Sequence, residues 1–209
     1  GMKGDQAMVE GVCASLLLNR NLEECAIVLD DTPMDYGFQE RFISLVALSQ
    51  SLVEISLVNC GMDDVCVSTL CDVLAKSSSS PLRILRLDGN LRMPEVGKSS
   101  MFLCTLLQTS KTLECLSLSS CHGILVSKIA EGLQLSSSIQ HFFMNDCGLM
   151  DEDIAILCNA VKNQHSLKTL SLDFNNVMAK GFTRIRSMLE VNTSITSMGY
   201  LRSLPEVGS

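Results

Sequence analysis

Leu113-Glu-Cys-Leu-Ser-Leu-Ser-Ser-Cys121 is the stretch that decides the fold, because its pattern recurs along the chain. Apolar residues stand at its first, fourth and sixth positions, and a cysteine stands at its ninth. With two weaker copies that start at Glu24 and Ile195, the stretch begins again at intervals of 28, 30, 31, 26, 28 and 28 residues. The other full copies are Leu52-Val-Glu-Ile-Ser-Leu-Val-Asn-Cys60, Leu82-Arg-Ile-Leu-Arg-Leu-Asp-Gly-Asn90, Ile139-Gln-His-Phe-Phe-Met-Asn-Asp-Cys147 and Leu167-Lys-Thr-Leu-Ser-Leu-Asp-Phe-Asn175.

The pattern L-x-x-L-x-L-x-x-(N/C) is the signature of a leucine-rich repeat. Each copy predicts a short strand, a turn at the ninth residue and then a helix, and the apolar faces become buried only when repeats stack. At the turn, asparagine can hydrogen-bond to backbone groups, and cysteine can fill the same small buried space. We therefore expect an α/β fold: a curved solenoid, or partial horseshoe, with a parallel β-sheet on its concave face and α-helices on its convex face.

The repeats predict a single leucine-rich-repeat domain over residues 1–209. We expect residues 5–20 to form a capping helix or the helix of a truncated repeat, and residues 24–200 to form about six to seven repeats. Residues 201–209 form a tail with no helix or polar cap behind the last strand. Because terminal repeats need a cap, we expect this tail to fold over the edge or the native protein to continue beyond it.

The helical half of the repeat carries a family resemblance. The phrases Cys60-Gly-Met-Asp-Asp64 and Cys147-Gly-Leu-Met-Asp-Glu152, with the helix ends that follow them, resemble the ribonuclease-inhibitor-like class of leucine-rich repeats. The resemblance covers about residues 22–200. It implies protein recognition through the concave face. Similar repeats occur in innate-immune receptors, in the activating protein of the nuclear-transport GTPase and in CARMIL-type actin regulators, so a GTPase-activating or ligand-sensing role is one alternative.

A second resemblance lies at the end of the chain. Met188-Leu-Glu-Val-Asn-Thr-Ser-Ile195, followed by Gly199 and Tyr200, is similar to the closing repeat of tropomodulin and leiomodin. This resemblance implies binding to the ends of actin filaments. Regulation of actin filaments or of capping protein is therefore the other alternative.

Composition excludes several classes of partner and chemistry. The net charge of -7 and the scattered lysines and arginines provide no basic stripe for nucleic acid. No apolar run is long enough to cross a membrane. The ten cysteines occupy turn and helix positions without any C-x-x-C pair, so we expect no metal site and interpret them as packing residues. Ten unpaired thiols indicate a reducing compartment, the cytoplasm or the nucleus.

No catalytic signature is present in the sequence. It contains no phosphate-binding P-loop, no G-x-S-x-G and no H-E-x-x-H. We therefore expect no catalytic residue, no cofactor and no small-molecule substrate. The sequence favours a non-catalytic protein–protein interaction module, as part of a larger intracellular protein.

The residues that would select a partner are those between the leucines, because side chains alternate faces along a strand. Phe143 and Phe174 should face solvent in this register, and aromatic residues with arginine dominate the binding energy of many interfaces. The alternative interpretation is that both phenylalanines fill gaps at the sheet edge, or are isolated exposed residues without a role. The predicted partner-binding patch on the concave face contains Arg86, Asp88, His141, Phe143, Asp146, Asp173 and Phe174.

Overall fold

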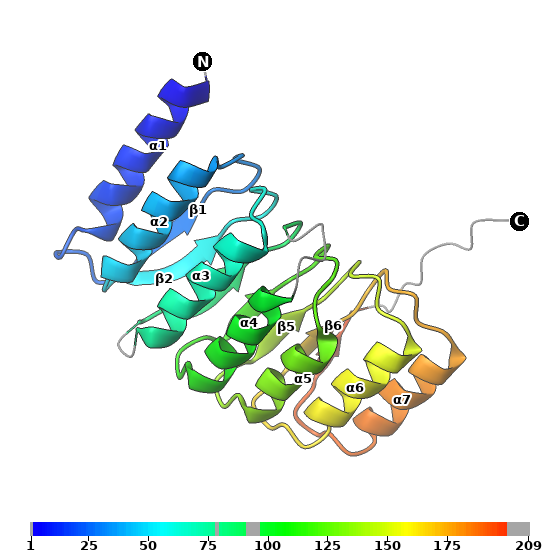
Figure 1. The fold of residues 1–209 in the computed structure, drawn as a ribbon. Helices are drawn as coiled ribbons and strands as arrows, with labels where there is room; N and C mark the ends of the chain where they lie inside the picture. The colour runs from blue at the N-terminus through cyan, green and yellow to red at the C-terminus, as the bar shows by residue number, and fades with distance from the viewer. Residues whose placement is uncertain (1, 78–79, 91–96, 200–209) are drawn as a thin grey trace, which may run out of the picture.

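The computed structural model describes residues 2–77, 80–90 and 97–199 (Figure 1). In this part of the chain, helices and strands alternate as the repeating pattern predicts, and the repeats are numbered here from one (starting at Glu24) to seven (starting at Ile195). The helices are α1 (Met2–Leu17), α2 (Tyr36–Leu48), α3 (Asp64–Lys76), α4 (Lys98–Thr109), α5 (Val126–Leu135), α6 (Asp151–Val161) and α7 (Ala179–Leu189). The strands are β1 (Cys25–Val28), β2 (Leu52–Ser56), β3 (Ile84–Arg86), β4 (Cys115–Ser117), β5 (His141–Phe143), β6 (Thr169–Ser171) and β7 (Ser197–Met198).

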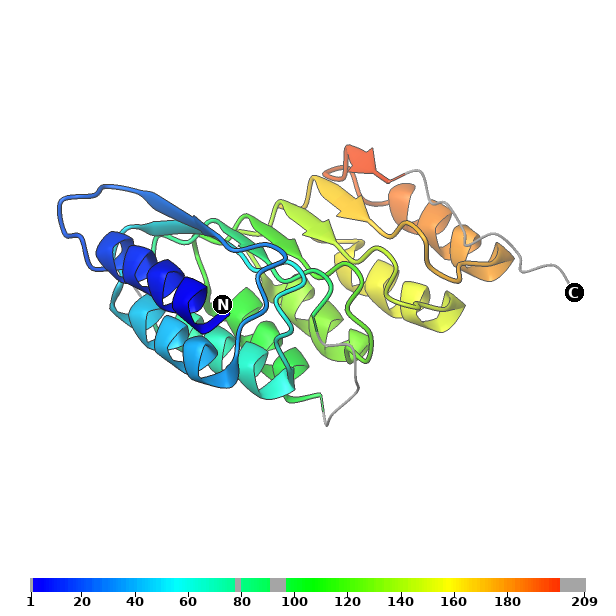
Figure 2. The same cartoon turned by 90° about the horizontal axis from the view of Figure 1, so that it is seen from above.

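The strands form one parallel sheet in which the spatial order follows the chain order from β1 to β7. The helices cover one face of this sheet and leave the other face open (Figure 2). Neighbouring strands lie about 4.8 Å apart, whereas packed helices need about 8–10 Å. The helical layer is therefore the longer one, and the sheet lies on the inner side of the curve. The predicted solenoid of alternating strands and helices is confirmed.

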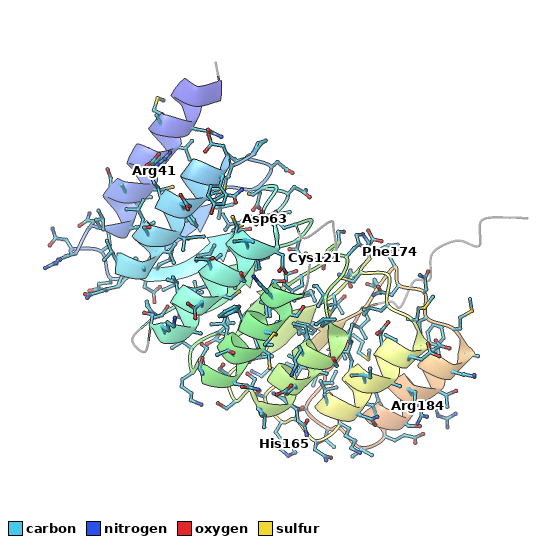
Figure 3. The ribbon with its side chains drawn as sticks, in the orientation of Figure 1. Arg41, Asp63, Cys121, His165, Phe174 and Arg184 are labelled. Carbon is cyan, nitrogen blue, oxygen red and sulfur yellow. The ribbon has the colours of Figure 1, made fainter. Side chains whose placement is uncertain are left out.

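The two ends of the strands lie along opposite edges of the solenoid (Figure 3). Cys121 and Phe174, which follow β4 and β6, lie along the edge where the strands end. His165, which precedes β6, lies along the opposite edge. We call the first of these the C-terminal edge of the sheet.

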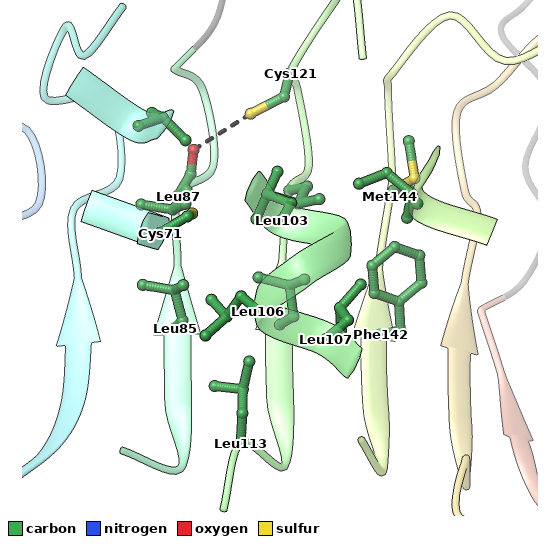
Figure 4. Packing of buried hydrophobic residues seen from close by; sticks show 14 of the residues in the cluster. Cys71, Leu85, Leu87, Leu103, Leu106, Leu107, Leu113, Cys121, Phe142 and Met144 are labelled. Carbon is green, nitrogen blue, oxygen red and sulfur yellow. Dashed lines mark hydrogen bonds between the residues drawn. The ribbon is translucent and has the colours of Figure 1, made fainter. Parts of the chain in front are cut away.

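The core consists of the apolar positions that define the repeat. In the fourth repeat Leu113 is 1% exposed, and Leu116 and Leu118 are fully buried. Leucines of α4, including Leu103 and Leu107, pack over the strands from the helical side (Figure 4). Full burial of one leucine side chain stabilises a fold by about 1.5–3 kcal/mol. Since each repeat contributes several such residues, stacking supplies the main driving force for this fold.

The asparagines at the ninth position join consecutive repeats. Asn90 is 1% exposed, and its Nδ2 donates to the carbonyl oxygens of Leu57 (2.7 Å) and Leu87 (2.9 Å). Its Oδ1 accepts a bond from the N–H of Met62 (3.0 Å). The side chain therefore satisfies backbone groups of its own turn and of the preceding repeat, which confirms the role predicted for asparagine.

The cysteines at the same position make a weaker version of this connection. Cys60, Cys121 and Cys147 are buried at the turn, as predicted. Each thiol donates to a carbonyl oxygen of the preceding repeat, and Figure 4 shows this bond for Cys121. The acceptors are Leu29 for Cys60 (3.1 Å), Leu87 for Cys121 (3.2 Å) and Leu118 for Cys147 (3.2 Å).

All ten cysteines are free thiols in the structure. Burial raises the pKa of Cys60 to about 11 and the pKa of Cys121 and Cys147 to about 12. A thiol with so high a pKa stays protonated at pH 7, so these three offer no thiolate to a metal or a substrate. Within the described residues, no group of three or more His, Cys, Asp or Glu side chains is arranged to hold a metal ion.

Helices of consecutive repeats are joined by capping carboxylates. Asp64, in the first turn of α3, is 8% exposed and accepts bonds from the N–H groups of Lys98 (3.1 Å) and Ser99 (3.0 Å) at the start of α4. Asp151, in the first turn of α6, accepts a bond from the N–H of Met178 (2.7 Å) just before α7. These bonds satisfy amide groups that a helix leaves without an internal partner.

The tail expected at 201–209 and Tyr200, the last residue of the predicted repeats, lie outside the described residues. None of the helices in the described part of the chain combines the length and the hydropathy that crossing a membrane requires.

Candidate functional site

The candidate site is the face of the sheet that the helices leave uncovered, which we call the open face. It presents the third and fifth residues of each repeat as two columns that run across the strands. The register predicted for these columns is confirmed from β2 to β6. The third-position column contains Glu54, Ile84, Cys115, His141 and Thr169, and the fifth-position column contains Ser56, Arg86, Ser117, Phe143 and Ser171.

The fifth-position column alternates small and long side chains. Ser56, Ser117 and Ser171 are only 1%, 7% and 6% exposed, although they belong to the open face. Arg86 and Phe143 stand between these serines in the register of the sheet. The serines are therefore sheltered between long neighbours, and Arg86 and Phe143 form the raised parts of this column.

Two residues of the predicted patch are already bonded to the neighbouring strand. Arg86 forms an ion pair with Glu54 of β2. His141 Nδ1 lies 3.0 Å from Thr169 Oγ1 of β6. Both pairs lie across adjacent strands, so Arg86 and His141 contribute to the cohesion of the sheet as well as to its surface.

Asp88, at the seventh position, has a structural role that its sequence context did not reveal. Its Oδ1 accepts bonds from the hydroxyl of Ser117 and the N–H of Ser119, both in the next repeat. The same pair of bonds recurs elsewhere with little change. Asp30 Oδ1 accepts from Ser56 Oγ (2.6 Å) and Val58 N (3.0 Å), and Asn145 Oδ1 accepts from Ser171 Oγ (2.8 Å) and Asp173 N (2.8 Å).

The eighth position has a left-handed backbone in each of the first six repeats. Phe174 has a φ of 58° there, and its side chain is 40% exposed. Left-handed conformations suit glycine, asparagine and aspartate and are unfavourable for a bulky side chain. Phe174 is therefore the exception in a column otherwise made of Asp31 (56°), Asn59 (54°), Gly89 (70°), Ser120 (55°) and Asp146 (52°).

Asp146 and Asp173 lie in neighbouring turns, where the N–H of Asp146 donates to the carbonyl oxygen of Asp173 (2.8 Å), but their carboxylates point apart. The Asp146 carboxylate accepts a bond from Ser120 of the preceding repeat (3.2 Å). The Asp173 carboxylate faces the following repeat, because a Cβ added to Gly199 would lie 2.3 Å from its Oδ2. The two acids thus point in opposite directions along the solenoid, which is not the arrangement of a shared-proton carboxylate dyad.

The seven predicted patch residues therefore separate into three groups. Phe143 and Arg86 rise from the fifth-position column, and His141 stands beside them in the third. Asp88 and Asp173 belong to the seventh position, while Asp146 and Phe174 belong to the eighth, along the C-terminal edge. The structure adds Asn145, which accepts a bond from Ser171 of the next repeat. The sequence contained a signal for this role: in each case where a repeat has serine at its fifth position, the repeat before it has Asp or Asn at its seventh.

A groove on the helical side was not predicted. It lies between α2 and α3, has a volume of about 740 Å³ and is lined mainly by apolar side chains. Tyr36, Leu48 and Val65 line it and are 57%, 66% and 46% exposed. The sequence contained one signal for this groove: apolar residues of α2 and α3 that fall outside the buried stripe of each helix. The groove lies on the face opposite to the predicted patch.

Residues 192–195, part of the segment that resembles the closing repeat of tropomodulin and leiomodin, have a role within the fold. Asn192 is 5% exposed, and its Nδ2 donates to the carbonyl oxygens of Val161 (2.7 Å) and Gln164 (2.9 Å). Its Oδ1 accepts from the N–H groups of Ser194 (2.8 Å) and Ile195 (2.9 Å). These bonds shape the loop between α7 and β7, so this part of the segment is explained by the solenoid itself.

Comparisons with known proteins give similarities of fold at low sequence identity. The chain matches no protein-family model, and no curated protein is detectably similar to it in sequence. Among solved structures, the chain is similar to the tropomodulin C-terminal domain of Caenorhabditis elegans, with 16% identity over 88% of this chain and 92% of that one and a TM-score of 0.48. It is also similar to leiomodin-1 actin-binding site 2, with 12% identity over 94% of this chain and 79% of that one and a TM-score of 0.35.

Proposed function

We propose that this chain is a non-catalytic protein-recognition domain that binds its partner through the open face and C-terminal edge around Phe143 and Phe174. The observation that carries the proposal is the position of Phe174. A half-exposed phenylalanine occupies a left-handed site that the other described repeats fill with Asp, Asn, Gly or Ser. Its ten free thiols support a reducing compartment.

The backbone conformation at Phe174 is an unfavourable one for a phenylalanine. A left-handed backbone at a residue with a Cβ costs about 1–2 kcal/mol relative to a right-handed one. The ring gains burial energy only from the part of its surface that is covered, because the side chain is 40% exposed. Strained residues of this kind are concentrated at functional sites, where the side chain is needed in that position.

Phe143 supports the same surface. It stands between Ser117 and Ser171 in the register of the sheet, and its side chain is partly exposed. A partly exposed aromatic ring with polar neighbours has the composition of an interface hot spot. The two phenylalanines come from consecutive repeats, so one partner can contact both.

The test is recovery of binding proteins from a lysate by the wild-type chain and by two variants, each first shown by circular dichroism to be folded. The first variant is Phe143→Ala with Phe174→Asn; the control is Leu135→Ala with Phe182→Ala, which removes exposed apolar side chains of the helical face. We expect the wild-type chain and the control to recover the same proteins, and the variant with Phe143→Ala and Phe174→Asn to fail to recover them. Equal recovery by all three folded proteins would contradict the proposal.

Two narrower functions are separated by direct assays. An actin-filament regulator would co-sediment with filaments or with capping protein, and that reading rests on the sequence resemblance of residues 188–200. A GTPase activator would accelerate phosphate release from a GTPase. If the recovered partner is neither actin-related nor a GTPase, and both assays are negative, the chain is a recognition domain of another kind.

A further inference from the structure

We propose that the groove between α2 and α3 binds an amphipathic helix of a partner protein, which lies antiparallel to α2 and α3 and has lysine or arginine in its last turn. The groove has a volume of about 740 Å³ and is lined by these two helices. Because the helices cover the face of the sheet opposite to the open face (Figure 2), this is a second recognition surface, separate from the one around Phe143 and Phe174.

The groove exists because a position that is small in the later helices is large in α2. The equivalent residues of α3 to α6 are Cys71, Cys104, Ala130 and Cys158. Helices approach closely there, since a Cβ added to Gly132 of α5 would lie 3.0 Å from Cys104 Cα. In α2 the same position is Ile43, which is buried and lines the groove. A branched side chain at the point of closest approach keeps α3 away from α2.

The walls of the groove match the apolar face of a helix. On α2 the lining runs from Tyr36 to Leu48, a length of about 18 Å at 1.5 Å per residue. On α3 it includes Val65, Thr69 and Val73, one residue per turn. A helix bound in a groove uses anchors at i, i+3, i+4 and i+7, which extend over about 11 Å. The groove is therefore long enough for such a face.

The lining comes from two neighbouring helices alone, so the groove is a channel that stays open along its outer side. Small-molecule pockets, in contrast, enclose most of the surface of their ligand. Tyr36, Leu48 and Val65 are exposed and would be covered only by an elongated partner that lies along the channel. This shape favours a helix over a small ligand.

One end of the groove is acidic. Glu40 lines this end, and the helices beside it begin at the capping residues Asp35 and Asp63. Arg41 also lines the groove, but its guanidinium is paired with the carboxylate of Glu10 (2.6 Å). Carboxylates are therefore in excess where α2 and α3 begin.

This charge determines the direction of the partner helix. A hydrogen bond to Glu40 raises the pKa of Tyr36, and the charge of Asp63 adds to this effect. The opposite end is lined by apolar side chains, among them Leu48 and Val73. Cations are favourable in the last turn of a helix. A partner with such a basic turn therefore places its C-terminus at the acidic end, and its dipole then opposes those of α2 and α3.

The test uses two fluorescein-labelled peptides of 15 residues, each held helical by a side-chain cross-link. Both have leucine at the same four positions, i, i+3, i+4 and i+7, and they differ only in the last turn, which contains three lysines in one and three glutamates in the other. Fluorescence anisotropy measures their affinities for the whole chain. We expect the lysine peptide to bind about tenfold more tightly, by a margin that narrows at high salt.

Two matched variants decide whether the groove is the binding site. Thr69→Trp fills the groove, whereas Thr105→Trp adds the same bulk to α4. Both threonines are exposed, and each hydroxyl donates to the carbonyl oxygen four residues earlier (2.8 and 3.1 Å). With both variants shown to be folded by circular dichroism, Thr69→Trp should weaken the lysine peptide about tenfold and Thr105→Trp should leave it unchanged.

A second pair of variants tests the acidic end. Glu40→Gln keeps an acceptor for the Tyr36 hydroxyl and removes the charge, and it should reduce the preference for the lysine peptide about threefold. Glu114→Gln changes the net charge equally at an exposed position on the sheet side and should keep the preference. Equal effects of the two glutamine variants would show that the preference reflects only the net charge of the chain, and would overturn the assigned direction.

The direction and the occupant each have a direct measurement. A nitroxide on the first residue of the lysine peptide should broaden the amide NMR signals of Leu48 and Val73 more than those of Gly37 and Val65. Sedimentation velocity of the chain alone tests a second copy as the occupant: a dimer that Thr69→Trp dissociates would overturn the proposal. Equal weakening by both tryptophan variants, or no binding of either peptide, would do the same. None of these outcomes bears on the recovery experiment with the phenylalanine variants.

Discussion

Asn175 Nδ2 donates a 2.8 Å hydrogen bond to the carbonyl oxygen of Met144, and this bond fastens the sixth repeat to the fifth. The same side chain donates to Leu172 O and accepts from the N–H groups of Cys147 and Leu149. Four backbone groups of two repeats thus depend on one amide that is 1% exposed.

Asn175→Ala should lower the free energy of unfolding by about 3 kcal/mol, because it leaves several buried backbone groups without partners. Urea unfolding followed by circular dichroism measures this loss. Asn176→Ala is the matched control, since Asn176 is the next residue and its side chain is exposed. A change below about 0.5 kcal/mol is expected for the control. Equal effects of both variants would show that the ninth-position amide is not a structural connection.

Phe174→Asn should stabilise the fold by about 1 kcal/mol, because asparagine tolerates the left-handed backbone. Phe182 provides the control: it is 41% exposed, close to the 40% of Phe174, but lies within helix α7. Phe182→Asn should leave stability unchanged or lower it. Thermal unfolding of the three proteins decides between these expectations, and a lower melting temperature for Phe174→Asn would refute the strain at this residue.

Gly132→Ala and Gly11→Ala should have opposite effects on stability. A Cβ at Gly132 would lie 3.0 Å from Cys104 Cα and 2.9 Å from Leu107 Cδ1, so α4 and α5 would have to separate. Nothing lies within 4 Å of a Cβ at Gly11 in α1. There, alanine should stabilise the helix by about 0.5–1 kcal/mol, whereas Gly132→Ala should cost about 1–3 kcal/mol. Chemical denaturation of both variants checks the sign of each change.

Asp64→Ala should destabilise the fold by about 2 kcal/mol, because the carboxylate accepts bonds from Lys98 N, Ser99 N and Ser99 Oγ. Asp72 is a suitable control, since it lies on the same helix and pairs with the exposed Lys76. Asp72→Ala is expected to change stability by less than about 0.5 kcal/mol. Amide hydrogen exchange should also rise at the start of α4 in Asp64→Ala alone; unchanged exchange there would contradict the capping role.

Stability should fall as the pH rises from about 9 towards 12. Burial raises the pKa of Cys60 to about 11 and of Cys121 and Cys147 to about 12, above the ordinary value of 9.0. The folded chain therefore holds protons that the unfolded chain releases above pH 9. The stabilisation that these thiols contribute is complete below pH 9 and is lost as the pH rises through their folded pKa values. At pH 10 the loss is about 1 kcal/mol per thiol.

The predicted loss of stability above pH 9 can be checked with a variant that carries asparagine in place of these cysteines. Replacing the three cysteines by asparagine, which occupies this position in repeats three and six, removes these three titrating groups. Urea unfolding at pH 7, 9 and 10 should then show a weaker dependence on pH than in the wild type. Equal slopes for the two proteins would assign the alkaline loss to other groups.

The solenoid and its register could be predicted because they follow from positions within one repeat. If Leu113 faces the core, the repeat pattern requires Leu116 and Leu118 to face it too, and all three are buried. The spacing of the repeats placed Phe143 beside Ser117 and Ser171. Contacts between repeats were not predictable in the same way. The bonds of Asp88 to Ser117 and Ser119, and the pair of Arg86 with Glu54, join residues about thirty positions apart and depend on rotamers.

The backbone at Phe174 also escaped prediction, since an alternation of faces does not report the sign of φ. The column of small and polar residues at the eighth position was the available signal. The groove between α2 and α3 depends on the distance between two helices, which the pattern of apolar residues does not fix.

In repeats two to six, the ninth-position side chain bonds to the repeat before it, and this gives the solenoid a direction. A repeat can be added after the last one without altering the bonds already made. Removal of a repeat, in contrast, leaves carbonyl oxygens of the repeat before it without a hydrogen-bond donor. Opening should therefore begin at the outer repeats and advance inward in single-repeat steps. In such a chain, mechanical pulling from either end would meet a series of small barriers rather than one large one.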